Sequence, residues 1–500
     1  MNKFKFACLA ILMNTVCSVF AGGLLTNTNQ NILFLRNPAR DGAIGIDGVY
    51  SNPAGVAFLT NGFHLSLNLQ NAHQTRTILT GYGDLFKYNV NRPASADNNY
   101  VHQFKGVADA PVIPSVQAAY VRDKWSVQFG FAITGGGGKC EFEDGLGSFE
   151  GVVASIPASL LAAGINNSLA AMGTQLTGGY GYEPFMRGRQ YYYGFTLGAT
   201  YKVTDNLSVY GGARMLYGTS NYYGYVKNIS LQQSIGGLPS MVSAPAFFNK
   251  LASTLTEAAG RYDALGMTEE AAAARAQAAQ MNGYSQMTED IELNCDQTGW
   301  GIAPIIGIDY KLGKLNLAAK YEFKTRMRLK NKSANSLSAS NIAMLDKFKD
   351  GKIVAEDSPA LLTLGAQYEI LPSLRVMAGY HHYFDTDTRQ YTGDKLGNSN
   401  EYLAGAEYDI NKYVQISAGL QKTSYDFEDS FMNDISFNVS SYSFGFGVGV
   451  NVTPKVKINA AYFQTNYEDY DKTETSGNMT VSNSFTRTNR VLGLGVDLTL

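Results

Sequence analysis

The 500-residue sequence is 45% hydrophobic and only 16% charged, with a formal net charge of −2 at pH 7. Soluble proteins average roughly 25% charged residues, and the chain has no polybasic block of the kind that binds nucleic acid. Its 52 glycines and 32 tyrosines suit close approach of strands and burial at a membrane–water interface.

Residues 1–21 have the pattern of a secretory signal peptide. Lys3 and Lys5 precede a short apolar run, and small residues stand at the two positions before the expected cleavage after Ala21. The run is too short to span a bilayer, which needs roughly 20 residues, and the residues before Cys17 do not match a lipoprotein signal. No later window is apolar enough for a transmembrane helix. We therefore expect an exported chain without a lipid anchor.

Residues 22–62 show no alternating pattern. The tripeptide Asn-Pro-Ala occurs at 37–39 and again at 52–54, just before the first predicted strand. Proline fixes φ and removes an N–H donor, so this segment resists joining a sheet. From the residues alone, the second copy also fits an ordinary turn that leads into the first strand.

From residue 63 onward, apolar side chains alternate with small or polar ones, as on a β-strand with two different faces. The clearest example is the segment 442–452. Fourteen strands are predicted, near residues 63–72, 112–121, 124–134, 191–203, 206–219, 298–311, 314–329, 359–370, 373–385, 400–410, 413–425, 440–452, 455–466 and 486–500.

The linkers between these strands are of two kinds, six of two residues each and the rest long. Short turns on one side and long loops on the other are typical of outer-membrane barrels. Lipid offers no hydrogen-bond partner to a free sheet edge, so the sheet must close. The sequence thus predicts an all-β fold, a transmembrane antiparallel β-barrel of about fourteen strands covering residues 63–500.

Charged residues on the predicted strands belong inside such a barrel, since a lysine facing lipid would cost about 2–4 kcal/mol at the midplane. Lys320, Glu322 and Lys324 alternate with apolar neighbours. The cations Lys320, Lys324, Arg214 and Arg375 could bind a substrate carboxylate. We favour pairing with glutamates inside the lumen.

The third strand runs directly into Gly135, Gly136, Gly137 and Gly138. Consecutive glycines weaken strand pairing and leave no side chains to fill a wall. The run therefore predicts either a kink or gap in the barrel wall or a flexible start to an outer loop.

A long outer loop, residues 220–297, contains alanine-rich helical stretches near 244–260 and 268–280. Short helices are marginal alone, so the loop either packs on itself or forms an apolar groove. The candidate groove residues are Met241, Val242, Phe247, Phe248, Leu251 and Leu255.

Two cysteines, Cys140 and Cys295, remain after removal of the signal peptide. Both are predicted near the same rim in a compartment that permits disulfides. The alternatives are one disulfide between two loops and two free thiols.

His381 and His382, followed by Asp385 and Asp387, resemble a metal or acid–base cluster. Adjacent residues on a strand face opposite ways, so the two histidines cannot serve one site. We expect no metal, no cofactor and no enzymatic activity.

The Asn-Pro-Ala segment before the first strand, the count of fourteen strands and the helical third outer loop together resemble the FadL/TodX family of outer-membrane transporters. The resemblance implies that residues 22–62 form a hatch inside the lumen, anchored by Asn52, Pro53 and Ala54. It also implies capture of substrate in the loop groove and sideways release at the third strand.

The expected function is uptake of hydrophobic compounds, such as long-chain fatty acids, by a monomer in the bacterial outer membrane. Its partners would be a lipophilic small molecule, outer-membrane lipid and, during biogenesis, the export and barrel-assembly machinery. A general porin for polar solutes is the alternative, followed by a surface-binding or enzymatic barrel. The residues do not select one lipophile.

Overall fold

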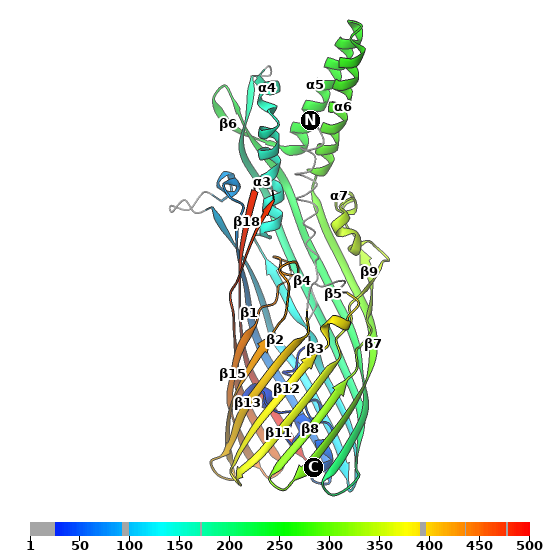
Figure 1. The fold of residues 1–500 in the computed structure, drawn as a ribbon, viewed down its shortest axis with the longest axis vertical. Helices are drawn as coiled ribbons and strands as arrows, with labels where there is room; N and C mark the ends of the chain where they lie inside the picture. Colours follow the sequence, from blue (N-terminus) through cyan, green and yellow to red (C-terminus); the bar gives the residue numbers. More distant parts are fainter. Residues whose placement is uncertain (1–25, 93–99, 171–172, 391–396, 436, 477–478) are drawn as a thin grey trace.

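The computed structural model describes residues 26–92, 100–170, 173–390, 397–435, 437–476 and 479–500. The expected signal peptide and its cleavage point after Ala21 lie outside these residues. Within them, fourteen antiparallel strands form a closed wall (Figure 1). The first wall strand pairs with the last, from His64 opposite Thr499 to Gly81 opposite Ser482. The predicted barrel and its fourteen strands are confirmed.

The wall strands are β1 (Gly62–Gly81), β2 (Val101–Arg122), β3 (Trp125–Phe142), β4 (Thr174–Lys202), β5 (Leu207–Ile235), β7 (Ile291–Leu312), β8 (Leu315–Glu322), β11 (Leu361–Leu371), β12 (Leu374–Tyr383), β13 (Ser399–Asp409), β14 (Val414–Ser424), β15 (Ser441–Thr453), β16 (Val456–Tyr467) and β18 (Met479–Thr499). Four shorter strands extend this sheet on the loop side: β6 (Leu238–Ser243), β9 (Arg328–Ser333), β10 (Ile353–Ala355) and β17 (Tyr470–Ser476).

Several strands reach further outward than the alternating pattern indicated. β4 begins at Thr174 and β5 ends at Ile235, whereas the pattern placed these limits at 191 and 219. The predicted outer loop 220–297 therefore contains the end of β5, all of β6 and the start of β7. Outside the membrane neither face of a strand needs to be apolar, so the alternation stops before the strand does.

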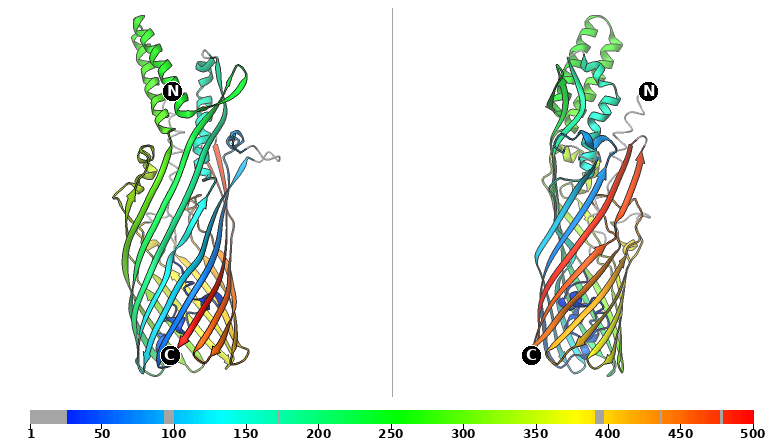
Figure 2. Two further views of the ribbon diagram at one scale, coloured as in Figure 1. Left: turned by 180° about the vertical axis from the view of Figure 1, so that it is seen from behind. Right: turned by 90° about the vertical axis from the view of Figure 1, so that its left-hand side faces the viewer.

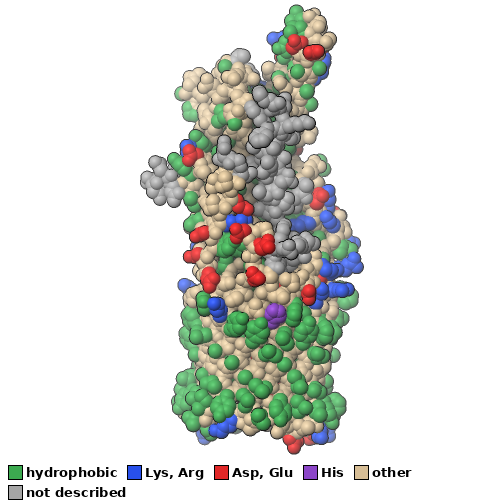
Figure 3. All heavy atoms as spheres, in the orientation of Figure 1, with side chains coloured by type: hydrophobic (Ala, Val, Ile, Leu, Met, Phe, Trp, Pro, Cys, Tyr) green, Lys and Arg blue, Asp and Glu red, His purple; other side chains and the backbone are tan. Residues whose placement is uncertain are grey.

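Two aromatic girdles mark the membrane-spanning part of the wall. The chain has two tryptophans, Trp125 and Trp300, and they are 59% and 64% exposed on the outer face. Trp125 lies beside the short turn before β3, and Trp300 lies twelve residues from Leu312 at the short turn after β7. On β7, Trp300 and Tyr310 are ten residues apart with exposed isoleucines between them. Ten residues of a tilted strand rise by roughly 25 Å, which is the height of the apolar band in such barrels. Figure 3 shows this band around the lower part of the wall.

The long loops and the strand extensions lie at one end of the barrel and carry most of the helices (Figure 1). These are α3 (Gly147–Ala162), α4 (Ile165–Leu169), α5 (Ala244–Ala264), α6 (Thr268–Met287) and α7 (Leu337–Ser340), together with the short 3-10 helices η3 (Leu85–Tyr88), η5 (Ala343–Phe348) and η6 (Asp385–Asp387). The pair α5 and α6 confirms the two predicted helical stretches. Among the described residues, no helix has the length and hydropathy needed to cross a membrane.

The outer loops pack around a buried carboxylate. Glu150 in α3 is fully buried, and its Oε1 lies 2.7 Å from Asn89 Nδ2, 2.9 Å from His102 Nδ1 and 2.9 Å from the Tyr180 hydroxyl. Phe86, which stacks on the His102 ring, belongs to the apolar cluster of the outer loops. The cluster ties the first outer loop to α3 and β4.

Residues 26–61, here called the N-terminal arm, lie inside the barrel at the end opposite the long loops (Figure 2). The arm contains α2 (Ile32–Arg36), η1 (Ile46–Val49) and η2 (Gly55–Phe58). Almost all of its residues are buried against the inner wall. The arm thus occupies the lumen at this level.

Candidate functional site

A trough of glycines on the inner wall receives the first half of the arm. A Cβ atom on Gly405 would lie 2.0 Å from Asn37 Oδ1, and one on Gly445 would lie 2.1 Å from the Leu35 carbonyl oxygen. Any larger residue would collide with the arm at these points. The trough glycines are Gly365, Gly379, Gly405, Gly419, Gly445, Gly447 and Gly493.

Two buried arginines fix this half of the arm. Arg36 has no exposed surface, and its guanidinium donates to Ser417 Oγ at 3.0 Å and to Asn459 Oδ1 at 2.6 Å. Arg40 forms ion pairs with Asp47 of the arm at 2.7 Å and with Glu407 of β13 at 2.6 Å. The first arginine is held by neutral side chains and the second by two carboxylates.

The second Asn-Pro-Ala copy docks on the opposite wall. Asn52 Nδ2 donates to Asp309 Oδ2 on β7 at 2.5 Å. The carbonyl of Pro53 accepts from Gln128 Nε2 on β3 at 2.8 Å, and that of Ala54 accepts from the Ser208 hydroxyl on β5 at 2.7 Å. Three consecutive residues therefore contact three different wall strands.

A histidine from the wall connects the arm to β13. His381 Nε2 lies 3.0 Å from Asp41 Oδ2, and its Nδ1 lies 2.7 Å from Glu401 Oε2. His382 faces the other way and lies 2.8 Å from Asn400 Oδ1. The predicted opposite orientation of the two histidines is confirmed.

The charges on the inner wall are mostly paired. Arg214 contacts Glu322 at 2.6 Å, and Arg375 contacts Glu407 at 3.6 Å. Lys320 instead donates to the Tyr50 carbonyl at 2.7 Å and lies over the Tyr50 ring. Pairing within the lumen, as predicted, is confirmed for the two arginines.

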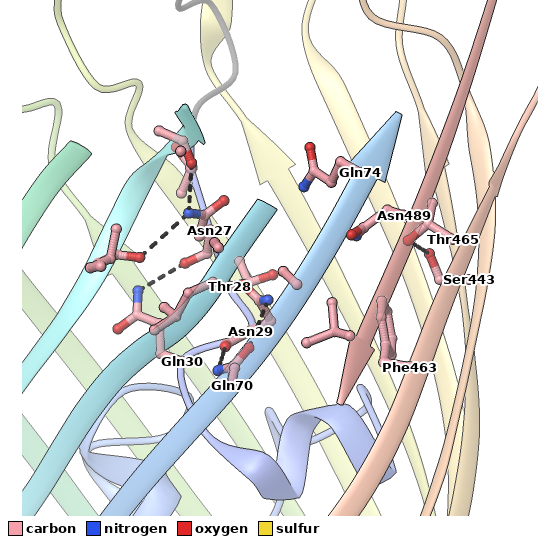
Figure 4. Close-up of a pocket in the computed structure, with 18 of the residues that line it drawn as sticks. Asn27, Thr28, Asn29, Gln30, Gln70, Gln74, Ser443, Phe463, Thr465 and Asn489 are labelled. Atoms are coloured by element: carbon pink, nitrogen blue, oxygen red, sulfur yellow. Dashed lines mark hydrogen bonds between the residues drawn. The ribbon is translucent and has the colours of Figure 1, made fainter. Parts of the chain in front are cut away.

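A cavity of about 210 Å³ lies above the arm, on the side of the long loops (Figure 4). Phe34, Phe463 and Val491 supply apolar surface at its base. Amides and hydroxyls line much of the rest, mainly Asn27, Asn29, Gln30, Gln70, Gln74, Thr423, Ser443, Thr465 and Asn489. The lining is mixed rather than uniformly apolar.

The barrel wall is interrupted beside this cavity. β2 and β3 pair from Arg122 opposite Trp125 to Val116 opposite Phe131, and pairing resumes only at Ala108 opposite Cys140. Residues 109–115 and 132–139 therefore do not pair with each other. Ala110 and Ile133, one from each strand, line the cavity at this break.

The predicted glycine run lies within the break. Gly136 and Gly138 have φ angles of +100° and +76°, which side chains with a Cβ rarely adopt. The pairing of β3 with β4 also shifts at Gly135. Because β3 continues to Phe142, the run kinks a strand and does not begin a loop.

The start of the arm binds this kink from inside. Asn27 N donates to the Thr134 carbonyl at 2.8 Å, and its side-chain amide donates to the Gly136 carbonyl at 3.2 Å. Thr26 forms an isolated bridge with Gly135. The arm and the break are therefore in direct contact.

The break begins within the apolar band. Ile133 lies nine residues above Lys124 at the short turn, whereas Trp300 of the outer girdle lies twelve residues above Leu312 at its own turn. With similar tilt, Ile133 is therefore closer to the membrane centre than Trp300. The first residues of the break therefore lie at the level of the apolar band.

The predicted groove residues have a different arrangement. Phe247, Phe248 and Leu251 are at most 5% exposed, and Phe248 packs against Tyr284 of α6. Val242 lies against the same cluster, Leu255 is half-buried, and only Met241 is exposed. For the three buried side chains the groove prediction is wrong, because the loop packs on itself.

Of the two alternatives for the remaining cysteines, the structure has two free thiols, Cys140 and Cys295, and not the disulfide. Cys140 lies opposite Gly188, Gly188 opposite Tyr222, and Tyr222 opposite Cys295. The two cysteines are therefore three strand spacings apart, roughly 14 Å. A disulfide needs Cα atoms within about 7 Å.

Sequence reasoning missed two parts of this site. Pro111 and Pro114 lie on β2 within the break, where proline removes ladder donors, and they could have been noticed next to the glycine run. The contact of Asp41 with His381 spans 340 positions and has no local signal. Among the described residues, no group of three or more His, Cys, Asp or Glu side chains is placed to hold a metal ion.

Comparisons with known proteins agree with this architecture. A family model described as "Outer membrane protein beta-barrel domain" matches residues 333–497. No curated protein matches the chain. The structure is similar to that of a Pseudomonas aeruginosa FadL homologue, with a TM-score of 0.60 and 11% identity over 95% of this chain and 99% of that one.

The P. putida toluene transporter TodX has a TM-score of 0.52 and 14% identity, covering 91% of this chain and 94% of that chain. A TodX deltaS2S3 mutant, titled a monoaromatic hydrocarbon channel, has a TM-score of 0.51 and 15% identity over 94% and 99% of the two chains. The predicted FadL/TodX resemblance and the outer-membrane β-barrel are confirmed at the level of the fold.

Proposed function

We propose that this outer-membrane barrel takes up hydrophobic compounds and releases them sideways into the membrane through the break between β2 and β3. The observation that carries the proposal is the position of that break, which lies beside the cavity above the arm and begins within the apolar band. The arm acts as the hatch, with Asn52, Pro53 and Ala54 as its anchor.

The physical chemistry of a lipophile supports a sideways exit. Each methylene group gains roughly 0.8 kcal/mol on leaving water, so release of a long alkyl chain into an aqueous compartment is strongly uphill. An exit that faces lipid avoids this step. Long-chain fatty acids and aromatic hydrocarbons both fit this reasoning.

The general porin is the weaker candidate, because the arm fills the lumen with buried side chains. In the proposed path, substrate reaches the cavity from the side of the long loops and leaves at Gly135–Gly138. Entry requires either that the packed base of α5 and α6 opens or that substrate passes by another route between the loops.

Ala110→Trp tests this path, because Ala110 pairs with β1 but not with β3 and lines the cavity. Cells carrying A110W should take up labelled oleate, and toluene as a second probe, at least tenfold more slowly than wild type. Ala118→Trp on the lipid face of the same strand is the matched control and should change uptake less than twofold.

Equal uptake by A110W and wild type, with the variant folded as judged by its mobility on unheated gels, would refute release at the break. Swelling of wild-type proteoliposomes in arabinose would instead favour the porin.

A further inference from the structure

A row of cations stands on the outer face of β9 and of the residues just before it. Arg326, Arg328, Lys330 and Lys332 are exposed, while the residues between them are buried. The buried neighbours are Thr325, Met327, Leu329 and Asn331. The alternation therefore points four consecutive outward side chains, all of them cationic, away from the barrel.

The structure gives these cations no acidic partner. Within the described ranges, none of the four lies within 4.0 Å of a carboxylate oxygen, unlike Arg214 or Arg375 on the inner wall. Asp296 lies opposite Lys332 in the register, but its carboxylate accepts from Asn221 instead. The chain as a whole has a net charge of −2, so the row is a local feature and not part of a generally basic surface.

The row begins at the outer edge of the apolar band. A Cβ on Gly301 would meet the Arg326 carbonyl, and one on Gly299 would meet the Arg328 carbonyl, so these two arginines flank Trp300 of the outer girdle. Lys330 and Lys332 follow further outward. In Figure 3, Lys and Arg side chains gather on the right just above the green band, on the side where Figure 1 labels β9.

We propose that this row is a binding site for the phosphate groups of a lipid in the outer leaflet of the surrounding membrane. Arginine guanidinium groups bind phosphate with two parallel hydrogen bonds. Cations next to an apolar membrane face are also attracted by an anionic lipid surface.

The geometry favours a lipid over a soluble polyanion or free phosphate. The side chains project sideways from the wall and not upward into the loops. A lipid whose acyl chains lie against the exposed isoleucines of β7 brings its headgroup to the level of Trp300 and the two arginines. A soluble ligand would make no additional contacts by binding at the level of the outer edge of the apolar band.

Native mass spectrometry of the full mature chain in detergent tests the proposal, with bisphosphorylated lipid A as the probe and its dephosphorylated form as the comparison. The variant R326Q/R328Q/K330Q/K332Q should bind the phosphorylated lipid at least tenfold more weakly than wild type. The matched control K124Q/K314Q/K412Q/K455Q removes four exposed lysines at the short turns of the opposite rim and should stay within twofold. Wild type should bind the dephosphorylated lipid no more tightly than the quadruple variant binds the phosphorylated lipid.

Wild-type affinity in the quadruple variant, or an equal loss in the rim control, overturns the proposal. So does competition by inorganic phosphate or dextran sulfate at the same concentration of anionic groups as the lipid, since either ligand would then suffice without a membrane. The double variants R326Q/R328Q and K330Q/K332Q provide folded proteins if the quadruple variant misfolds, and each should show part of the loss. Uptake of oleate is a separate measurement, so failure here leaves the proposed function untouched.

Discussion

Arg40→Gln should release the arm from the barrel lumen. Arg40 is 4% exposed and is paired with Asp47 and Glu407, whose side chains are equally buried. Removing one member of a buried ion-pair network leaves the remaining charges uncompensated, which costs about 3–5 kcal/mol. Since each 1.4 kcal/mol is a factor of ten, the displaced state should become about 10²- to 4 × 10³-fold more populated.

Two assays report whether the arm has left the lumen. Trypsin should cleave after Arg36 in the variant, whereas in wild type this arginine has no exposed surface. In planar bilayers the variant should show larger and more frequent conductance steps. Arg389→Gln is the control, because Arg389 pairs with Asp357 at 2.6 Å in the outer loops, away from the arm.

The triple variant R40Q/D47N/E407Q adds a second check, since it removes the unpaired charges as well as the arginine. Neutral replacement of a whole buried network is often tolerated, so much of the protection at Arg36 should return. The reasoning fails if R40Q stays closed and protected in a folded barrel, or if R389Q opens the lumen equally.

Three further outcomes are expected. Burial raises the pKa of Asp385, in the loop after β12, to about 6, so ionisation of this carboxyl as the pH rises from about 4 to 6 lowers the stability of the folded protein. The urea midpoint of D385N should therefore exceed that of wild type by more at pH 7.5 than at pH 4.5. An equal difference at the two pH values would count against this reasoning. The denatured, unreduced mature chain should contain two reactive thiols, Cys140 and Cys295, and a count of none would mean that they are bonded. Glu150→Ala should cost about 1–3 kcal/mol and expose the outer loops to protease, with Glu150→Gln losing less; resistance equal to wild type would show that this carboxylate does not hold the loops.

The fourteen strands could be predicted because lipid on one face and a polar lumen on the other impose a strict alternation. The same reason limits the prediction to the membrane. β5 continues sixteen residues beyond the predicted end at 219, in a region where no lipid selects apolar side chains. The helices α5 and α6 were visible from composition, but whether Phe247 and Phe248 pack or stay open depends on tertiary contacts.

The candidate site was less predictable, because most of its contacts are long-range. The glycine run at 135–138 gave a local signal for the kink, yet the missing pairing depends equally on β2. The cysteines illustrate the limit of strand maps. The predicted order already put Cys140 after the third strand and Cys295 before the sixth, but it placed both in loops, which can bend toward each other. The structure places them within β3 and β7, and this holds them three strand spacings apart.

The two Asn-Pro-Ala copies have parallel local roles on opposite walls. Asn37 Oδ1 accepts from Ala39 N, and Asn52 Oδ1 accepts from Gly55 N, both at 3.1 Å. Each asparagine thus closes its own turn, one in the glycine trough and one against β7. The two Asn-Pro-Ala copies, fifteen residues apart in the sequence, are therefore two attachment points of one segment that crosses the lumen.

The contacts of the arm differ in strength along its length. Its first residues meet the β3 kink through neutral backbone and amide hydrogen bonds at Asn27, each worth about 1 kcal/mol net. Further along, Arg40 and Asp41 are held by buried charges on β12 and β13. The start of the arm can therefore leave the break at a far smaller cost than the lower arm can leave the lumen. For this reason loss of Arg40, and not of Asn27, is the change that should open the barrel.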